Sequence, residues 1–198
     1  MTLADHARRL KFTRPRGLPP AFLLTDETRL PDPAAVMMRL PAGTGVLLRL
    51  YGVADHLALA ERIAAVARSR RLVLAVAADW RLAARLGAAV IHLPEGIGRS
   101  GRNAPLLDWA RRRGVAVTMA CHSPRAVAAA RRLGADAALL SPVFATASHP
   151  GAAVIGAVRF RLWRARAGLP VYALGGIDAR SLRRLNGGGF AAIAGWGA

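Results

Sequence analysis

A histidine follows one of the apolar, strand-like runs of the sequence at a position suited to proton transfer. His122 comes shortly after the run at residues 115–119 and directly before Ser123 and Pro124, a pair typical of a helix N-cap and first helical residue. The positive end of that helix dipole favours the neutral imidazole, which accepts a proton near pH 7. His122 is therefore a candidate catalytic group, and the alternative is an imidazole that only hydrogen-bonds at a strand end.

Glycines follow the last two apolar runs of the chain. Gly175 and Gly176 come after residues 171–174, and Gly195 follows residues 190–193 in a Gly-Trp-Gly sequence. Because glycine has no Cβ, its backbone N–H groups can approach an anion closely, and a helix starting near Asp178 adds a positive dipole end. Either glycine group alone is typical of a tight turn, but both at consecutive strand ends favour a phosphate site.

The longest connection, residues 141–151, carries hydroxyl groups and another histidine, at Thr146, Ser148 and His149. Long loops on a rigid scaffold often cover a binding site, so we expect these side chains to face a ligand; a solvated surface turn is the alternative. Cys121 and His122 do not predict a nucleophile and its base, because adjacent residues of a strand point to opposite sides.

Acidic side chains are scarce, and their positions do not predict a metal centre. The 198 residues include 29 Lys and Arg against 11 Asp and Glu, which gives a net charge of +18. Only Asp26, Asp79 and Glu95 follow strand-like runs, without a spaced carboxylate pair or a Cys/His ligand set. The arginines are spread along the chain and cluster at the ends of amphipathic helices. This pattern favours a small anionic ligand over nucleic acid, which would require arginines interleaved with exposed aromatic residues.

Short apolar runs alternate with longer Ala/Leu/Arg segments of helical period along the whole chain. Eight strands are predicted at residues 22–25, 46–49, 72–76, 89–92, 115–119, 137–140, 171–174 and 190–193. Seven helices are predicted between them, at residues 33–40, 54–69, 80–86, 104–113, 124–133, 157–167 and 179–185. This order predicts the α/β class and a compact (β/α)8 TIM barrel, with an open doubly wound sheet as the alternative.

The sequence given ends soon after the eighth strand, so the barrel is expected to lack most or all of its final outer helix. We expect a single domain over residues 1–198, in which residues 1–20 are an N-terminal extension and a helix at residues 2–10 plugs the barrel floor. The wall beside strands 8 and 1 would then expose apolar surface, which predicts a homodimer contact or a truncated chain. One cysteine, no signal-type segment and no long apolar run predict a cytoplasmic protein without a membrane span.

Four segments resemble successive blocks of the thiamine phosphate synthase/TenI family. They are residues 72–93 (LVLAVAADWRLAARLGAAVIHL), 114–123 (GVAVTMACHS), 134–151 (GADAALLSPVFATASHPG) and 170–177 (PVYALGGI). The resemblance covers about residues 22–195, and its last two blocks are the more specific. It implies a (β/α)8 barrel that acts on the thiazole phosphate of thiamine biosynthesis. The synthase branch joins this phosphate to hydroxymethylpyrimidine pyrophosphate with Mg²⁺, and the TenI branch includes thiazole tautomerases that move a proton with a histidine.

The resemblance also implies roles for individual residues. Thr146 and Ser148 match the family's T-x-[ST] hydroxyls, the pair Gly175 and Gly176 matches its glycines, and the backbone near Gly195 completes the phosphate site. His122 falls at the position of the TenI histidine.

The residues that the synthase branch uses for pyrophosphate and metal are mostly replaced. Of the Q-x-R-x-K pattern at strand 2 the chain keeps only Arg49, and the N-D pair after strand 3 falls on Ala77 and Ala78. The acidic ligand after strand 4 falls near Ile97, and the lysine after the hydroxyl pair is His149. A pyrophosphate leaving group with Mg²⁺ needs carboxylates and cations that these positions do not supply.

We therefore expect a TenI-like protein that binds a phosphorylated heteroaromatic ligand and transfers a proton through His122. Arg49, Thr146, Ser148, His149, Gly175, Gly176 and Gly195 are its predicted substrate-binding residues. One alternative is a genuine thiamine phosphate synthase, in which Asp79 reaches a Mg²⁺ site and arginines replace the lysines. The other is a phosphate-ligand-binding protein without catalysis.

Overall fold

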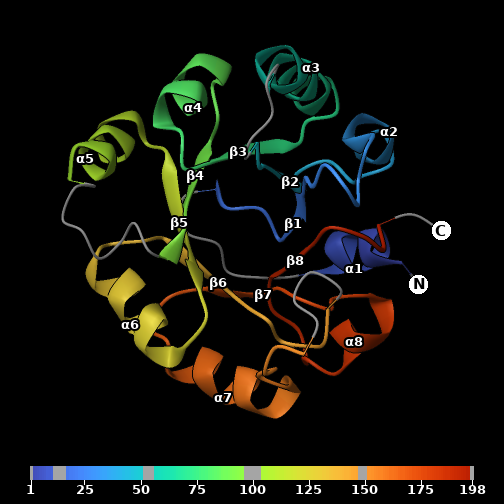
Figure 1. The fold of residues 1–198 in the computed structure, drawn as a ribbon, viewed down its shortest axis with the longest axis vertical. Helices are drawn as coiled ribbons and strands as arrows, with labels where there is room; N and C mark the ends of the chain where they lie inside the picture. Colours follow the sequence, from blue (N-terminus) through green and yellow to red (C-terminus); the bar gives the residue numbers. More distant parts are fainter. Residues whose placement is uncertain (1, 11–16, 51–55, 96–103, 147–150, 197–198) are drawn as a thin grey trace.

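The chain folds as a closed barrel of parallel strands surrounded by helices (Figure 1). The structure is a computed structural model that describes residues 2–10, 17–50, 56–95, 104–146 and 151–196. In those residues eight strands pair in sequence order and β8 closes onto β1, with Phe22 opposite Ala191. The predicted (β/α)8 barrel is therefore confirmed, and the open doubly wound sheet is excluded.

The strands alternate with helices in the predicted order. The strands are β1 (Ala21–Leu24), β2 (Gly45–Leu48), β3 (Val73–Ala77), β4 (Val90–Leu93), β5 (Ala116–Cys121), β6 (Ala137–Leu140), β7 (Val171–Ala173) and β8 (Phe190–Ala192). The helices are α1 (Leu3–Arg9), α2 (Pro33–Met37), α3 (His56–Ser69), α4 (Trp80–Leu86), α5 (Ala104–Arg113), α6 (Pro124–Arg132), α7 (Ala157–Arg166) and α8 (Ala179–Arg183). No helix within these residues is long and apolar enough to cross a bilayer.

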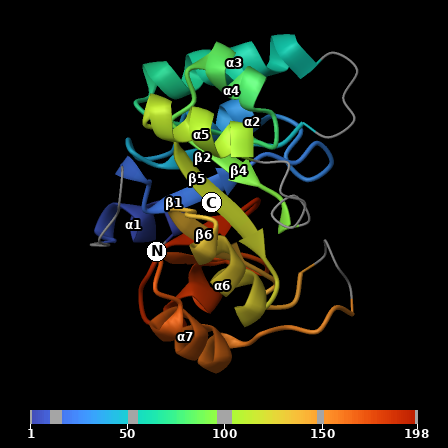
Figure 2. The ribbon, with the colours of Figure 1, turned by 90° about the vertical axis from the view of Figure 1, so that its left-hand side faces the viewer.

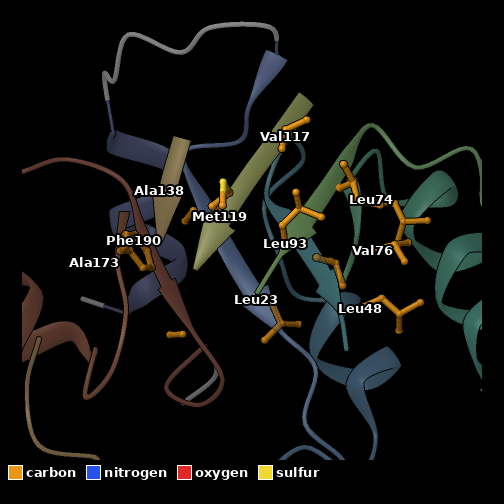
Figure 3. Packing of buried hydrophobic residues seen from close by; sticks show 14 of the residues in the cluster. Leu23, Leu48, Leu74, Val76, Leu93, Val117, Met119, Ala138, Ala173 and Phe190 are labelled. Atoms are coloured by element: carbon orange, nitrogen blue, oxygen red, sulfur yellow. The ribbon is translucent and has the colours of Figure 1, made fainter. Parts of the chain in front are cut away.

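Each strand has one face toward the barrel interior and one toward the helices, because successive side chains of a strand alternate. On β1, Phe22 and Leu24 belong to the interior cluster, whereas Ala21 and Leu23 belong to the layer between strands and helices. Figure 3 shows part of that outer layer, including Leu23. The same alternation turns Cys121 toward the helix layer and brings His122, the next residue, to the mouth of the barrel.

The barrel floor is closed by residues just before and within the strands. Leu18 and Tyr172 are fully buried in the interior cluster, where the Tyr172 ring meets the edge of Phe22 at 5.3 Å between centroids. The Tyr172 hydroxyl donates to the carbonyl oxygen of Pro19 at 2.7 Å. The expectation that the N-terminal helix plugs the floor is therefore wrong, because Leu18, Phe22 and Tyr172 already fill it.

Helix α1 instead lies in the outer ring, between α8 and α2 and beside β8 and β1 (Figure 1). The side view also shows α1 next to β1 (Figure 2). Leu3 and Ala7 of this helix are buried in the layer between strands and helices, and Trp196 stacks on Phe190 of β8 at 5.5 Å. The wall beside β8 and β1 is thus covered by the chain itself. The exposed wall on which the homodimer expectation rested is absent from the described residues.

Local signals at the helix ends explain why the boundaries were predictable. Ser123 caps α6 by accepting from the N–H of Ala126, and Asp79 caps α4 by accepting from the N–H of Leu82. Gly87 ends α4 in the left-handed conformation, as C-terminal glycines do.

Candidate functional site

A cavity of about 720 Å³ opens at the carboxyl ends of the strands, where barrels of this architecture carry their sites. Its lining comes from the ends of β1, β2 and β5 to β8. The residues that carry polar groups or turns in it are Arg29, Arg49, His122, Ser141, Thr146, Gly175, Gly176, Asp178 and Gly195. Six of the predicted site residues are therefore in one cavity, while Ser148 and His149 lie outside the described residues.

His122 is held at the mouth of the barrel by three hydrogen bonds. Its backbone N–H donates to Oε2 of Glu95 at 2.9 Å, and its ring Nδ1 lies 2.9 Å from the carbonyl oxygen of Ser141. The Ser141 hydroxyl is also 3.3 Å from Nδ1. Because a carbonyl oxygen only accepts hydrogen bonds, Nδ1 carries the proton in this arrangement. Nε2 of the neutral ring then keeps its lone pair for a ligand.

Gly175 and Gly176 form a turn that a larger residue cannot occupy. Their φ angles are +89° and +62°, and a Cβ on Gly176 would lie 2.3 Å from the carbonyl oxygen of Ala145. The turn is pinned to the loop after β6, since the N–H of Val143 donates to Leu174 and that of Phe144 to Gly175. The tight-turn interpretation of this glycine pair is thus correct. The turn is also compatible with phosphate binding, because the same packing places glycine backbone, with no side chain over it, at the cavity.

The helix after this turn does not add a free N-terminus. Helix α8 has only five residues, and Oδ1 of Asp178 accepts from the N–H groups of both Arg180 and Ser181. These contacts lower the pKa of the Asp178 carboxyl, chiefly through the backbone N–H of Ser181. Asp178 therefore already occupies the N–H groups of Arg180 and Ser181 that were expected to help bind an anion. Among the described residues, the backbone N–H groups of Gly176 and Gly195 have no acceptor.

Gly195 lies against the N-terminal helix. A Cβ at this position would be 3.4 Å from Cδ1 of Leu3, and the backbone has a φ of +84°. Helix α1 therefore supports the turn after β8, a role that no pattern in the sequence predicts.

Two arginines line the cavity at the ends of β1 and β2. Arg49 is fixed through its backbone, whose N–H donates to Oγ1 of Thr25 at 2.8 Å. Nη2 of Arg29 is 2.5 Å from Oδ2 of Asp26, and the Arg29 N–H donates to the other carboxylate oxygen at 3.0 Å. These contacts, with the charge of Arg49 as a smaller effect, lower the pKa of Asp26. Arg29 was missed because it lies five residues beyond the end of β1.

A buried histidine lies inside the barrel. Nδ1 of His92 is 2.9 Å from Oγ1 of Thr118, and both side chains are buried. Burial, together with the smaller effect of the nearby charge of Arg49, lowers the pKa of His92 to about 4. His92 is thus neutral at physiological pH and agrees with the structural role predicted for it.

The carboxylates near the cavity do not form a site that fits a divalent metal. Asp26 pairs with Arg29, Asp79 caps α4, and Glu95 accepts from the N–H of His122. No three His, Cys, Asp or Glu side chains in the described part of the chain are grouped as metal ligands. A Mg²⁺ ion prefers several oxygen ligands in octahedral geometry, which these separately engaged carboxylates do not offer.

Comparison with known proteins gives consistent matches. The TMP-TENI family model, described as thiamine monophosphate synthase, matches residues 23–198. A putative thiamine-phosphate synthase 2 of Aquifex aeolicus is 30% identical over 137 residues, which are 69% of this chain and 71% of that protein. A thiamine-phosphate synthase of Deinococcus radiodurans is 34% identical over 149 residues, 73% of this chain but only 50% of that protein.

Solved structures share the fold at lower identity. A thiamine phosphate pyrophosphorylase from Pyrococcus furiosus superposes with a TM-score of 0.73 at 21% identity, covering 92% of this chain and 90% of that chain. FabK from Thermotoga maritima gives a TM-score of 0.62 at 16% identity, covering 97% of this chain and 61% of that chain. At these identities the structural likeness supports the barrel fold alone.

Proposed function

The chain belongs to the thiamine monophosphate synthase family, and on that basis we propose that its rim cavity binds the thiazole phosphate of thiamine biosynthesis and that His122 moves a proton on the bound ring. The observation that carries this proposal is the contact between Nδ1 of His122 and the Ser141 carbonyl. It leaves Nε2 as the proton acceptor in a cavity that also contains the glycine turns.

The phosphate belongs at the turns after β7 and β8. Gly176 and Gly195 present backbone N–H groups without an acceptor among the described residues, and Thr146 adds a hydroxyl to the same cavity. Backbone N–H groups that converge on an anion bind it without a charged side chain. The heteroaromatic ring then extends over the barrel mouth toward His122.

The proposed reaction is a tautomerisation, in which atoms balance without a second reactant. Nε2 of His122 removes a proton from one ring carbon, and the electron pair of the broken C–H bond moves into the ring. The imidazolium keeps its Nδ1–H on the Ser141 carbonyl and returns a proton from Nε2 to another ring atom. Because this step has no pyrophosphate leaving group, we propose that it needs no Mg²⁺.

Hydrogen exchange tests this function directly. With thiazole phosphate in deuterated buffer, NMR should show deuterium entering the ring in the presence of the protein. His122→Gln should slow the exchange about 10²–10⁴-fold, the contribution of a positioned acid–base group, while ligand affinity changes little. Cys121→Ala is the matched control, because Cys121 is adjacent on β5 but buried on the helix side.

Two outcomes would contradict this proposal. Exchange at an unchanged rate in His122→Gln would remove His122 from the chemistry. Tight binding of thiazole phosphate without any exchange would instead indicate a ligand-binding protein.

A genuine synthase is the second candidate, favoured by the names of the two curated relatives and by Arg49 in the cavity. It would join thiazole phosphate to hydroxymethylpyrimidine pyrophosphate and release pyrophosphate. Measuring pyrophosphate release with both substrates and Mg²⁺ separates the two candidates. Release that depends on Mg²⁺ would establish the synthase and replace the tautomerase proposal.

A further inference from the structure

Apolar side chains are exposed along the outer face of α7 and just before it. Val158 is 61% exposed and Leu162 is 50% exposed, and Val154, two residues before Gly156 at the helix start, is 42% exposed. Only one other large apolar side chain in the described residues, Met38, is exposed to this degree. Both ribbon views show α7 at the outer edge of the molecule (Figures 1 and 2). Single exposed apolar residues are ordinary, but a cluster rimmed by polar groups marks an interaction surface.

The exposed apolar residues of α7 form one row along the helix. Val158, Leu162 and Ala165 are spaced by four and three residues, so they lie on the same face, and all three are exposed. The opposite face is the one that packs on the barrel, through the buried Ala157 and Phe160. We call the exposed row the α7 ridge. Because the helix has ten residues, the ridge is part of a surface about 15 Å long.

Exposed arginines flank the α7 ridge on both sides. With 3.6 residues per turn, Arg159 and Arg166 lie in line on one side of the ridge, and Arg161 lies on the other. Arg164 is different, because it donates to the carbonyl oxygen of Gly187 and its guanidinium lies 5.7 Å from the centre of the Phe160 ring. Three of the four arginines of α7 are therefore directed to solvent beside the ridge.

The neighbouring sequence provides no carboxylate to neutralise these arginines. No Asp or Glu occurs between Asp136 and Asp178. Asp136 accepts from the N–H of Val117, and Asp178 caps α8. None of the ion pairs between described residues involves an arginine of α7. Carboxylates that complement the flanking arginines must therefore come from another molecule.

The charges and the apolar residues together select the kind of partner. A second copy of the chain would place arginines opposite arginines in a two-fold pairing of α7 helices, which is repulsive. A lipid surface is matched by helices that insert aromatic and leucine side chains, whereas Phe160 and Trp163 pack against the core. Nucleic acid would need exposed aromatic rings among the arginines. A helix with apolar residues on one face and carboxylates beside them matches both the ridge and its arginines.

We propose that the α7 ridge and its flanking arginines form a docking surface for an acidic amphipathic helix of a partner protein. The apolar face of that helix packs on Val158, Leu162 and Ala165, and its carboxylates pair with the arginines on either side. In paired helices, the charges beside the apolar contact decide which partner is accepted. None of these residues lines the rim cavity, so the proposal does not depend on the ligand bound there.

Designed peptides test this surface by fluorescence anisotropy with the full chain. The acidic probe is a labelled helical peptide of about three heptads with Leu at the a and d positions and Glu at e and g. One comparison peptide has Lys in place of Glu, and another has the acidic composition in scrambled order. The acidic probe should bind at least about tenfold more tightly than either. Raising the ionic strength to about 0.5 M should weaken its binding, because exposed charge pairs are screened.

Variants assign the binding to α7. Leu162→Glu should weaken the acidic probe at least about tenfold, because it places a carboxylate in the apolar contact, where it has no partner. Arg161→Glu should weaken it severalfold, since it opposes like charges. Met38→Glu and Arg68→Glu are the matched controls. They alter an exposed apolar residue just after α2 and an exposed arginine of α3, which lies across the barrel from α7 (Figure 1).

Reversing all the flanking charges gives a second, positive readout. The triple variant Arg159→Glu, Arg161→Glu, Arg166→Glu should bind the Lys peptide more tightly than the acidic one, while the ridge itself is unchanged. All three positions are exposed, so the variant should unfold at nearly the same temperature as the parent chain.

Several results would overturn the proposal. Equal binding of the scrambled peptide, or unchanged binding in Leu162→Glu, would reduce the effect to general attraction between opposite charges. Phosphatidylserine vesicles or a DNA oligonucleotide that bound more tightly than the acidic helix, and through the same residues, would replace the proposed partner. A dimer seen by sedimentation in the parent chain and lost in Leu162→Glu would show that a second copy covers the ridge.

Discussion

Replacing Leu3 with alanine tests whether the N-terminal helix serves as the eighth outer helix of the barrel. Leu3 is fully buried at the start of α1 and belongs to the same apolar layer as Phe190 and Trp196. It also approaches the backbone of Gly195. Leu3→Ala would therefore open a gap between the helix, the wall beside β8 and the turn that follows it.

The expected cost follows from the burial. A fully buried leucine cut back to alanine costs about 2–5 kcal/mol in the free energy of unfolding, and the cost is largest where the surroundings cannot collapse. Helix α1 has only seven residues, so it can shift to fill part of the gap. We therefore expect about 3 kcal/mol, which for a chain of this size lowers Tm by roughly 6–12 °C.

The measurement is thermal and urea unfolding of both proteins, with Leu162→Ala as the control. Leu162 lies on α7 and is 50% exposed, so its truncation should cost less than about 0.5 kcal/mol. Leu3→Ala should also weaken thiazole phosphate binding, because Leu3 supports the Gly195 turn. A Tm shift no larger than that of Leu162→Ala would show that α1 does not pack on the barrel in solution, and would refute this account of the wall.

Two further predictions concern the glycine turn and the barrel interior. Gly176→Ala should lower the free energy of unfolding by about 3 kcal/mol or more and abolish thiazole phosphate binding, because the new Cβ meets the carbonyl oxygen of Ala145 at a φ of +62°. The control is Gly187→Ala, which has a φ of +80° but open space around it and should cost only about 1 kcal/mol. Equal losses in unfolding measurements would contradict the clash at Gly176. Between pH 7 and pH 5 the free energy of unfolding should fall by about 2 kcal/mol through His92. Its pKa of about 4 in the folded state lies below the unfolded value near 6.5, so in this range mainly the unfolded chain takes up the proton. Urea titrations at both pH values should show a smaller loss in His92→Gln, and an identical loss would mean that His92 is already protonated or exposed in the folded chain.

The regular part of the fold was predictable because its signals are local. The helices at Trp80–Leu86 and Ala104–Arg113 and the strand at Ala137–Leu140 have the predicted bounds, each set by a capping residue, a glycine or a change of period. Helix α2 ends earlier than predicted, at Met37, where the N–H of Arg39 turns back to Val36 ahead of a proline. Only the turn geometry in three dimensions shows this early end.

The position of α1 was not predictable for a different reason. The sequence around Leu3 shows a capped amphipathic helix, but its pattern does not say which gap in the ring the helix fills. That choice depends on the wall left open after β8 and on the residues that already close the floor, Leu18 and Tyr172 among them. The covering of this wall and the filling of the floor both depend on contacts between distant parts of the sequence.

The residues of the candidate site also fall into a predictable group and an unpredictable group. Residues next to strand ends, such as His122 and Gly175, could be placed at the rim by counting from the strands. The Ser141 carbonyl that fixes the tautomer is a backbone group and leaves no signal in the sequence. Arg29 carries no signal either, because only the turn after β1 returns its side chain to the cavity.

The carboxylates of Asp79, Glu95 and Asp26, near the carboxyl ends of the strands, are already engaged in contacts that stabilise the structure. A divalent ion that recruited Asp79 would remove the N-cap of α4, a loss of about 1 kcal/mol, and recruiting Glu95 would release the N–H of His122. Recruiting Asp26 would leave Arg29 without its carboxylate. A metal at these groups must therefore offset the loss of contacts that stabilise the start of α4, the backbone of His122 after β5 and the side chain of Arg29. An anionic ligand needs none of these three carboxylates, and the net charge of +18 also favours its approach from a distance. The same three hydrogen-bonding patterns therefore weigh against a divalent ion held by these carboxylates.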